Sequence, residues 1–300
     1  MVNREPDMNT RRDFLKGAGA TTGIVFCSCG LRDAAWAQQG GGGQRLPVMV
    51  NGKRVKTIDV HAHCRFRKAV ALMGDEAGRV LSQTRGAQEQ FIVIEERLKT
   101  QGLRGAAIGG SVLGEDFSEA KFHPVWAKAE ELGAVLFIHP QSTPDLARRF
   151  KGNGWLANTI GNPLDTTIAL QHLIFEGTLD RFPGLKIIAA HGGGYLASYA
   201  ARSDHACFVS PQNCNPEIKL KKKPSEYLNQ LYFDALVFTP EALRHLVAQV
   251  GASQVMLGSD HPIPWEPHPV DHVFATATLT DDEKMAILGG NAARLFGMNG

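Results

Sequence analysis

The chain has 300 residues, of which 43% are apolar, and a formal net charge of +2 at pH 7. This length and composition suffice for one large core, and a single α/β barrel commonly takes about 250 residues. A charge so close to zero argues against a nucleic-acid partner, and no apolar run approaches the ~18 residues that a membrane span needs.

The first 37 residues are expected to be a targeting segment and not part of the fold. Residues 10–16 (TRRDFLK) have the twin-arginine pattern, and a weakly apolar stretch rich in Gly and Ala follows. Residues 35–37 (AWA) match a small-residue cleavage site, so export to the periplasm is expected. Residues 38–46 contain the sequence QQGGGGQ and are predicted to be a flexible linker, which leaves 47–300 as one domain.

The rest of the chain alternates between strand and helix patterns. Asn51-Gly52, between two arms of alternating polarity, predicts a β-hairpin within 47–56. Six strands are predicted at 57–63, 104–111, 134–139, 186–191, 231–237 and 255–260, and helices at 123–132, 163–176, 240–250 and 281–296. The last helix is expected to start on an Asp281 cap and to be interrupted at Gly289-Gly290. Strands that alternate with helices predict a parallel sheet.

Four of these strands end in side chains that bind metals. The side chains are His61 and His63 in TIDVHAH, His139 in AVLFIHP, His191 in KIIAAHGGG and Asp260 in VMLGSD. Residues i and i+2 of a strand point to the same face, and parallel strands carry their chemistry at their carboxyl ends. A single histidine at a strand end is more often structural, but the recurrence on four strands favours one divalent-metal site of the zinc type.

This order of ligands resembles the amidohydrolase superfamily. The surrounding sequence is similar to the amidohydrolase-related branch that contains aminocarboxymuconate semialdehyde decarboxylase and the resorcylate-type decarboxylases. The matching stretches are IDVHAH, FHPVWAKAEELGAVLFIHP, LIFEGTLDRFPGLKIIAAHGGG, LYFDALVFTPEALRHLVAQVGASQVMLGSDHPIPWE and GGNAARLFG. The HGGG and GSDxPxPxE pieces are more specific for this branch than the HxH pair.

The resemblance implies a TIM-type (β/α) barrel with one divalent ion, expected to be zinc. It implies that the ion is held by His61, His63, His139 and Asp260. His191 and Asp260 are then the catalytic residues, with His191 beside the ion to transfer a proton.

Two further residues are expected to bind the substrate. The resemblance implies that Arg202, eleven residues after His191, reaches into the pocket of a neighbouring subunit to bind a carboxylate, which implies a homodimer. An ordinary surface arginine is the alternative. Trp155, in the glycine-rich stretch KGNGWLAN, is a candidate to stack on a planar substrate, although aromatic residues more often pack in cores.

The resemblance also shows a gap in this chain. About forty residues lie between His63 and Arg104, whereas two strand–helix units of roughly thirty residues each are needed there. The chain is therefore predicted to be shortened between the first and fourth barrel strands, with about six of eight units visible. We expect the first strand to pair directly with 104–111, or the sheet to stay open.

The cysteines outside the leader are Cys64, Cys207 and Cys214, of which Cys207 and Cys214 can form a disulfide in the loop after His191.

Three functions fit these residues. The branch-specific motifs favour a metal-dependent decarboxylase, a carboxy-lyase acting on an unsaturated or aromatic carboxylic acid. The same ligands equally suit a metal-dependent hydrolase of a C–N, C–O or C–C bond. The gap leaves a third alternative, an inactive remnant that still binds metal.

Overall fold

The computed structural model describes residues 47–62, 104–112, 114–140, 143–261 and 263–298. The predicted leader and linker, His63, Cys64 and the shortened interval before Arg104 lie outside these residues, so the predictions about them stay predictions. The fold begins with the predicted hairpin, in which β1 (Met49–Val50) pairs antiparallel with β2 (Lys53–Arg54). Its turn residues Asn51 and Gly52 have φ of 46° and 72°, the left-handed backbone that a tight hairpin turn requires.

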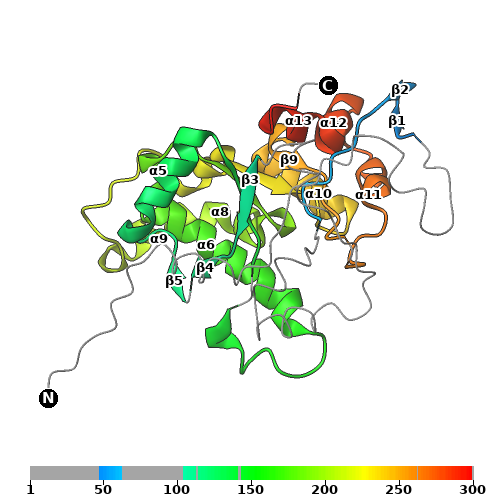
Figure 1. Cartoon of the computed structure of the whole chain (residues 1–300). Helices are drawn as coiled ribbons and strands as arrows, with labels where there is room; N and C mark the ends of the chain where they lie inside the picture. Colours follow the sequence, from blue (N-terminus) through cyan, green and yellow to red (C-terminus); the bar gives the residue numbers. More distant parts are fainter. Residues whose placement is uncertain (1–46, 63–103, 113, 141–142, 262, 299–300) are drawn as a thin grey trace, which may run out of the picture.

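A five-stranded parallel sheet forms the centre of the molecule (Figure 1). Its strands are β3 (Gly105–Ile108), β6 (Val135–Ile138), β7 (Lys186–Ala189), β8 (Leu231–Asp234) and β9 (Val255–Met256). Each strand pairs with the next one along the chain. A short antiparallel pair, β4 (Ser111–Val112) and β5 (Glu115–Asp116), follows β3. Such a sequential order of parallel strands, with helices between them, is the winding of an α/β barrel.

The first predicted strand lies beside the last one. The Val60 N–H donates to the Leu257 carbonyl at 2.9 Å, and Ala62 forms a parallel bridge with His261. The prediction of a regular strand over 57–63 is wrong for residues 57–61, because the Ile58 N–H donates instead to the Leu288 carbonyl near the C-terminus. In a closed barrel the first strand lies next to the last one, and this first segment has that position.

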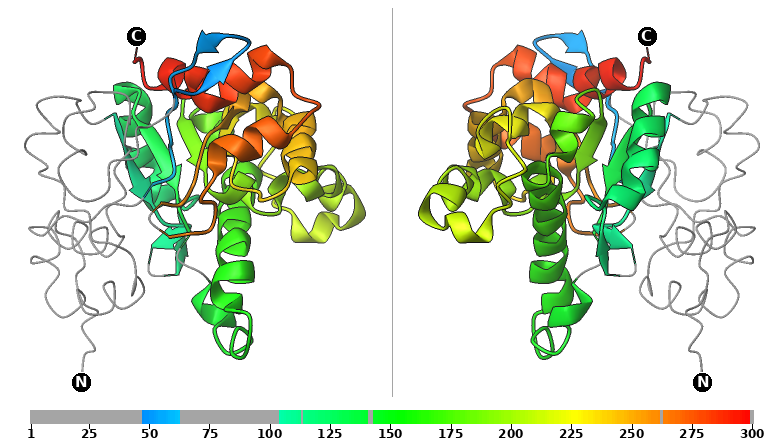
Figure 2. Two further views of the ribbon diagram at one scale, coloured as in Figure 1. Left: turned by 90° about the vertical axis from the view of Figure 1, so that its right-hand side faces the viewer. Right: turned by 90° about the vertical axis from the view of Figure 1, so that its left-hand side faces the viewer.

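Helices cover the sheet, and the principal ones follow the prediction. Those between the strands are α5 (His123–Leu132), α6 (Asn162–Phe175), α7 (Thr178–Arg181), α8 (Leu196–Ser203), α9 (Ala206–Val209) and α10 (Pro240–Val250). After β9 come α11 (Pro269–Ala275), α12 (Asp281–Met285) and α13 (Asn291–Leu295). Figure 2 shows α12 and α13 at the same end of the molecule as the β1–β2 hairpin. None of the helices in the described ranges is long and apolar enough to cross a membrane.

The last helical segment differs from the prediction in the residue that caps it. Thr280, and not Asp281, caps α12, because its hydroxyl accepts the Glu283 N–H while the Glu283 carboxylate accepts the Thr280 N–H. The predicted interruption is a π-helical turn over Ala286–Gly290, which separates α12 from α13 and ends in Gly289-Gly290. A Cβ at Gly289 would lie 2.0 Å from the Lys56 carbonyl oxygen, so glycine is needed for this close approach to the first segment.

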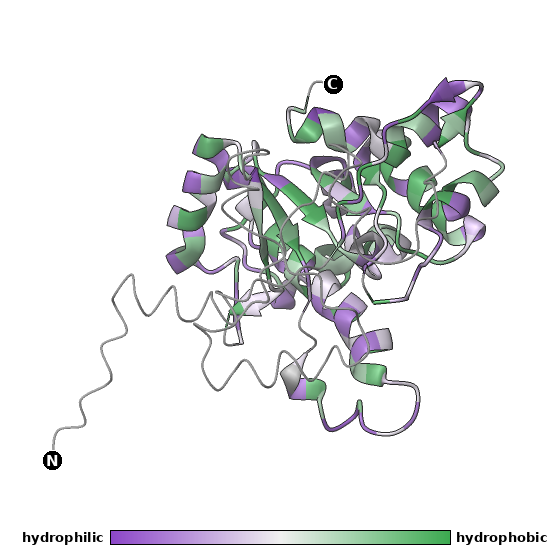
Figure 3. Ribbon diagram, turned by 45° about the vertical axis from the view of Figure 1, so that its right-hand side comes forward, coloured by the Kyte–Doolittle hydropathy of each residue, from purple (hydrophilic) through white to green (hydrophobic). Residues whose placement is uncertain are grey.

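Alternating side chains of the buried strands divide the core into two clusters. In β6, Leu136 and Ile138 belong to the larger cluster with the covering helices, whereas Val135 and Phe137 belong to the smaller cluster with Ile188. Figure 3 shows the hydrophobic strands at the centre and hydrophilic residues on the outer side of α5. Because His139 follows Phe137 by two residues, the strand period directs its side chain to the same side as Phe137.

Candidate metal centre

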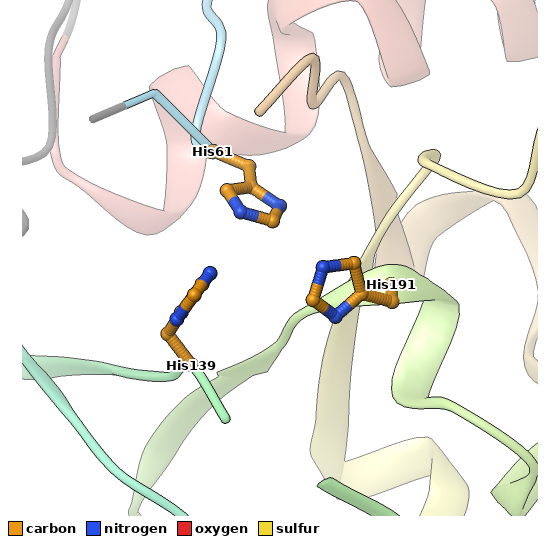
Figure 4. A group of neighbouring side chains, drawn as sticks. All are labelled: His61, His139 and His191. Carbon is orange, nitrogen blue, oxygen red and sulfur yellow. The ribbon is translucent and has the colours of Figure 1, made fainter. Parts of the chain in front are cut away.

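Three histidines from three separate segments converge at the carboxyl end of the sheet (Figure 4). His61 ends the first segment, His139 follows β6, and His191 follows β7. The ring centroid of His61 lies 5.1 Å from each of the other two, which are 5.6 Å apart. One nitrogen from each ring lies within 4.8 Å of the others, a spacing at which one ion can bind all three.

The backbone turn at His191 explains how its side chain reaches this cluster. Ile188 of β7 and Ala190 just after it belong to the same small cluster as Phe137, so a regular strand would turn residue 191 to the opposite side. His191 instead has φ of 57°, in the left-handed region that a histidine rarely adopts. Such strain persists where the surrounding structure enforces it, often at functional sites.

The HGGG motif supplies the space for this turn. A Cβ at Gly193 would lie 2.7 Å from the Phe233 ring, and one at Gly194 would lie 2.0 Å from the Pro163 carbonyl oxygen. Both glycines also have positive φ, 77° and 65°. Side chains are therefore excluded here by both backbone conformation and packing.

Asp260 joins the cluster from the loop after β9. It is buried and has φ of 63°, and its N–H donates to the His61 carbonyl at 2.7 Å. Its Oδ1 lies 3.1 Å from His61 Nε2. Two atoms that bind one ion at about 2.1 Å each lie about 3 Å apart, so this spacing suits ligands of a shared ion.

Asp234, at the end of β8, is a further part of this centre that sequence analysis did not single out. Its Oδ2 lies 2.6 Å from His61 Nδ1 and accepts the His191 N–H at 2.9 Å. Its Oδ1 accepts the N–H groups of Gly192 (2.8 Å) and Leu236 (3.1 Å). The signal was present in the sequence, because LYFD ends a buried strand in a carboxylate just as VMLGSD does.

The carboxylates make the centre favourable for positive charge. Burial alone would raise the pKa of Asp234, but the hydrogen bond and charge of His61 and the charge of His191 outweigh it and lower this pKa. Burial alone would lower the pKa of His61, yet its hydrogen bonds to Asp234 and Asp260 raise that pKa to about 10. The same electrostatics that hold a proton on His61 would attract a divalent cation in its place.

The donor set fits a divalent metal. Three imidazoles and one carboxylate are nitrogen and oxygen ligands of the type that borderline first-row ions prefer. His61, His139 and Asp260 lie where the sequence predicts ligands, and His63 lies outside the described residues. His123 lies outside this cluster, edge-on to Phe182 with ring centroids 5.6 Å apart.

The two predicted substrate-binding residues are not part of this cluster. Arg202 lies on the exposed side of α8. Trp155 is 53% exposed and stacks on Trp265, with ring centroids 5.7 Å apart and planes 16° apart.

The fold and the histidine cluster together define an α/β barrel with a divalent-metal site. A family model described as Amidohydrolase (Amidohydro_2) matches residues 54–298, and the chain belongs to this family. Among its relatives, 2-amino-3-carboxymuconate-6-semialdehyde decarboxylase of Dictyostelium discoideum is 34% identical over 202 residues, which cover 66% of this chain and 54% of the relative. The chain thus spans about half the length of that protein.

Solved structures agree with the fold. The 5-carboxyvanillate decarboxylase of Sphingomonas paucimobilis matches with a TM-score of 0.61 and 26% identity, over 79% of each chain. A mutant of the Novosphingobium aromaticivorans 5-carboxyvanillate decarboxylase, solved with bound manganese, matches with a TM-score of 0.58 and 25% identity, over 67% of this chain and 60% of that one. These relatives confirm the barrel and the decarboxylase-containing branch that the sequence motifs indicate.

The ligand set can be tested through metal content. His61→Ala and Asp260→Ala are each expected to weaken metal binding by more than about tenfold, because the loss of a residue that only supports a ligand already lowers the metal affinity by about that factor. The metal-to-protein ratio of both purified variants should therefore fall. His123→Ala, which removes a histidine outside the cluster, should retain its metal. Elemental analysis of the purified proteins measures this, and unchanged metal in the first two variants would contradict the assignment.

Proposed function

We propose that the protein is a metal-dependent decarboxylase acting on an unsaturated or aromatic carboxylic acid. The observation that carries this proposal is the imidazole of His191, held beside the ligand pair His61 and His139. This pairing of a cation with a proton donor suits decarboxylation, in which a carbon is protonated and carbon dioxide leaves. The Dictyostelium, Sphingomonas and Novosphingobium relatives are decarboxylases by name, which supports this reaction over hydrolysis.

The reaction divides between the ion and the protein side chains. When bound, the divalent ion supplies Lewis acidity toward an oxygen of the substrate. His191, in its protonated form, donates its proton to the carbon that bears the carboxylate. The bond to the carboxylate carbon then breaks, its electron pair returns to the unsaturated system, and carbon dioxide leaves. His191 regains its proton from solvent.

Zinc is the ion that we propose, held by His61, His63, His139 and Asp260. Three imidazoles are a more usual set for zinc than for manganese, which favours carboxylate, carbonyl and water ligands. The manganese bound in the Novosphingobium structure makes manganese the alternative ion.

Three aromatic side chains support a planar substrate. Trp155 stacks on Trp265, and Phe238 lies edge-on to Trp265 with ring centroids 6.2 Å apart. They follow β6, β9 and β8, so their loops start at the carboxyl ends of the strands, as the three histidines do. Because Trp265 covers one face of the Trp155 ring, we propose that the other face contacts the substrate.

The exposed side of α8 and α9 suits a second copy of the chain. Beside Arg202 in sequence lie Tyr199, Phe208 and Val209, which are 59%, 86% and 73% exposed. Burying these apolar side chains in a homodimer would bring Arg202 to the partner, where we propose that it binds the substrate carboxylate.

We propose a periplasmic location, as the twin-arginine pattern indicates. The predicted disulfide Cys207–Cys214 is present and closes the loop that carries Phe208. Disulfides persist mainly in oxidising compartments, and this supports export of the chain.

The reaction itself is tested by screening aromatic and muconate-type acids with a coupled assay for carbon dioxide. Release of carbon dioxide from at least one acid, abolished by a metal chelator and restored by zinc, is the expected result. Turnover of lactones or amides with none of the acids would replace the proposal with the hydrolase. A metal-loaded protein that turns over none of these compounds would instead be the inactive remnant.

His191→Ala is expected to separate proton transfer from metal binding. Loss of a general acid typically lowers kcat about a hundredfold to ten-thousandfold, and most of the metal should stay bound to the remaining ligands. Elemental analysis beside the kinetic assay checks both effects. Metal loss as large as that of His139→Ala would make His191 a ligand.

Mixing two inactive variants tests Arg202 and the dimer together. In a dimer of one Arg202→Ala subunit and one His61→Ala subunit, one of the two sites has both residues if Arg202 acts across the interface. Activity should then return to about a quarter to a half of the wild-type value, given a two-fold dimer. No recovery, in a mixture shown to contain heterodimers, would place Arg202 in its own subunit's site. Full activity of the Arg202→Ala protein by itself would place Arg202 outside the reaction.

A further inference from the structure

We infer that Asp234 is a positioning residue that sets the ring orientation of His61 and the backbone position of His191 at the same time. The inference deepens the proposed function and rests on it for the roles of the two histidines. Asp234 acts through its contacts with His61 and His191, and it is not itself proposed as a metal ligand or a proton donor. Through one carboxylate, it would connect the metal ligand to the proton donor.

The first part of the argument concerns the ring of His61. Its Nδ1 lies 2.6 Å from Asp234 Oδ2, and both side chains are fully buried. An ionised carboxylate only accepts hydrogen bonds, so Nδ1 carries a proton in this contact. Nε2, on the other edge of the ring, faces Asp260 Oδ1 at 3.1 Å. In the neutral tautomer that this contact favours, Nε2 has the lone pair that a metal needs.

The second part concerns the turn at His191. The same Oδ2 accepts the His191 N–H at 2.9 Å, and Oδ1 accepts the Gly192 N–H at 2.8 Å. Successive N–H groups directed at one anion are a recurring way to stabilise a turn that includes left-handed residues. His191 and Gly192 have φ of 57° and 60°, so the carboxylate holds the strained backbone that turns the His191 ring toward His61.

The two contacts share one oxygen atom, and this makes the inference specific. A carboxylate that served only the turn would have no need to contact the His61 ring, and one that served only the ring would not need two backbone donors. Loss of the Asp234 charge should therefore weaken metal binding and displace His191 together.

The test compares Asp234→Asn with the matched control Asp204→Asn. The Asp204 carboxylate also accepts one backbone N–H and one side-chain donor, both from Ser225, at 2.8 and 2.7 Å, but it lies outside the histidine cluster. Zinc affinity, measured by competition with a chromophoric chelator, should fall about tenfold to a hundredfold in Asp234→Asn. In Asp204→Asn it should stay close to the wild-type value.

A spectroscopic measurement separates positioning from a general structural role. In zinc-loaded wild-type protein labelled with ¹⁵N-histidine, His61 should carry its proton on Nδ1, with the signal assigned by its loss in His61→Gln. In Asp234→Asn the proton should leave Nδ1 or lose its strong hydrogen bond. A wild-type His61 protonated on Nε2 would overturn the inference, even if Asp234→Asn fails to fold.

The outcomes distinguish this inference from the proposed function. Unchanged zinc affinity in folded Asp234→Asn would overturn the positioning role, whatever reaction the wild-type protein catalyses. Weakened zinc binding with the expected change in the His61 signal, but no decarboxylation of any acid by the wild-type protein, would sustain the positioning role and reject the proposed function.

Discussion

The centre of this molecule depends on one buried hydrogen bond, between His61 and Asp234, which are 173 residues apart in the chain. A buried carboxylate and a buried imidazole are each costly to remove from water, and their contact offsets that cost only when the geometry is good and further hydrogen bonds are present. Asp234 accepts three backbone N–H groups besides the ring. The bond therefore also ties the first segment of the fold to the turn after β7 and to the end of β8.

Parallel strands make this arrangement possible. Their carboxyl ends meet at one edge of the sheet, so single residues at the ends of β6, β7 and β8 become neighbours without any local sequence relation. The first segment reaches the same edge through its contacts with residues 257–261. Residues that are far apart along the chain therefore contribute to one electrostatic environment, in which two carboxylates lie beside three imidazoles.

Sequence predicted the parts of the fold that depend on local pattern. The helices over 123–132 and 240–250 have the predicted bounds, since proline at the first turn and a glycine after the last turn mark both. Asn51-Gly52 likewise predicted the hairpin. The strand predicted at 57–63 was less successful, because its N–H partners come from Leu257 and Leu288, and no local pattern contains that information.

In the candidate site, too, the local sequence pattern predicted single residues but not the contacts between distant ones. His61, His139, His191 and Asp260 were identified because each ends an apolar strand, and the structure brings all four together. Asp234 ends a strand in the same way, but one acidic residue has many structural roles, and its pairing with a ring 173 residues away appears only in three dimensions. The side to which His191 points also depended on a left-handed backbone that strand periodicity does not predict.

The stacked pair Trp155–Trp265 has a consequence for spectroscopy. Two indoles with ring centroids 5.7 Å apart are close enough for their electronic transitions to couple, so the optical spectra of this pair differ from those of an isolated indole. The only other tryptophans in the chain are Trp36, in the predicted leader, and the buried Trp126. A mature chain would thus carry one such chromophore pair, in the loops after β6 and β9, and one isolated indole in its core. Optical spectra of the unlabelled protein would then distinguish changes in these two loops from changes in the core.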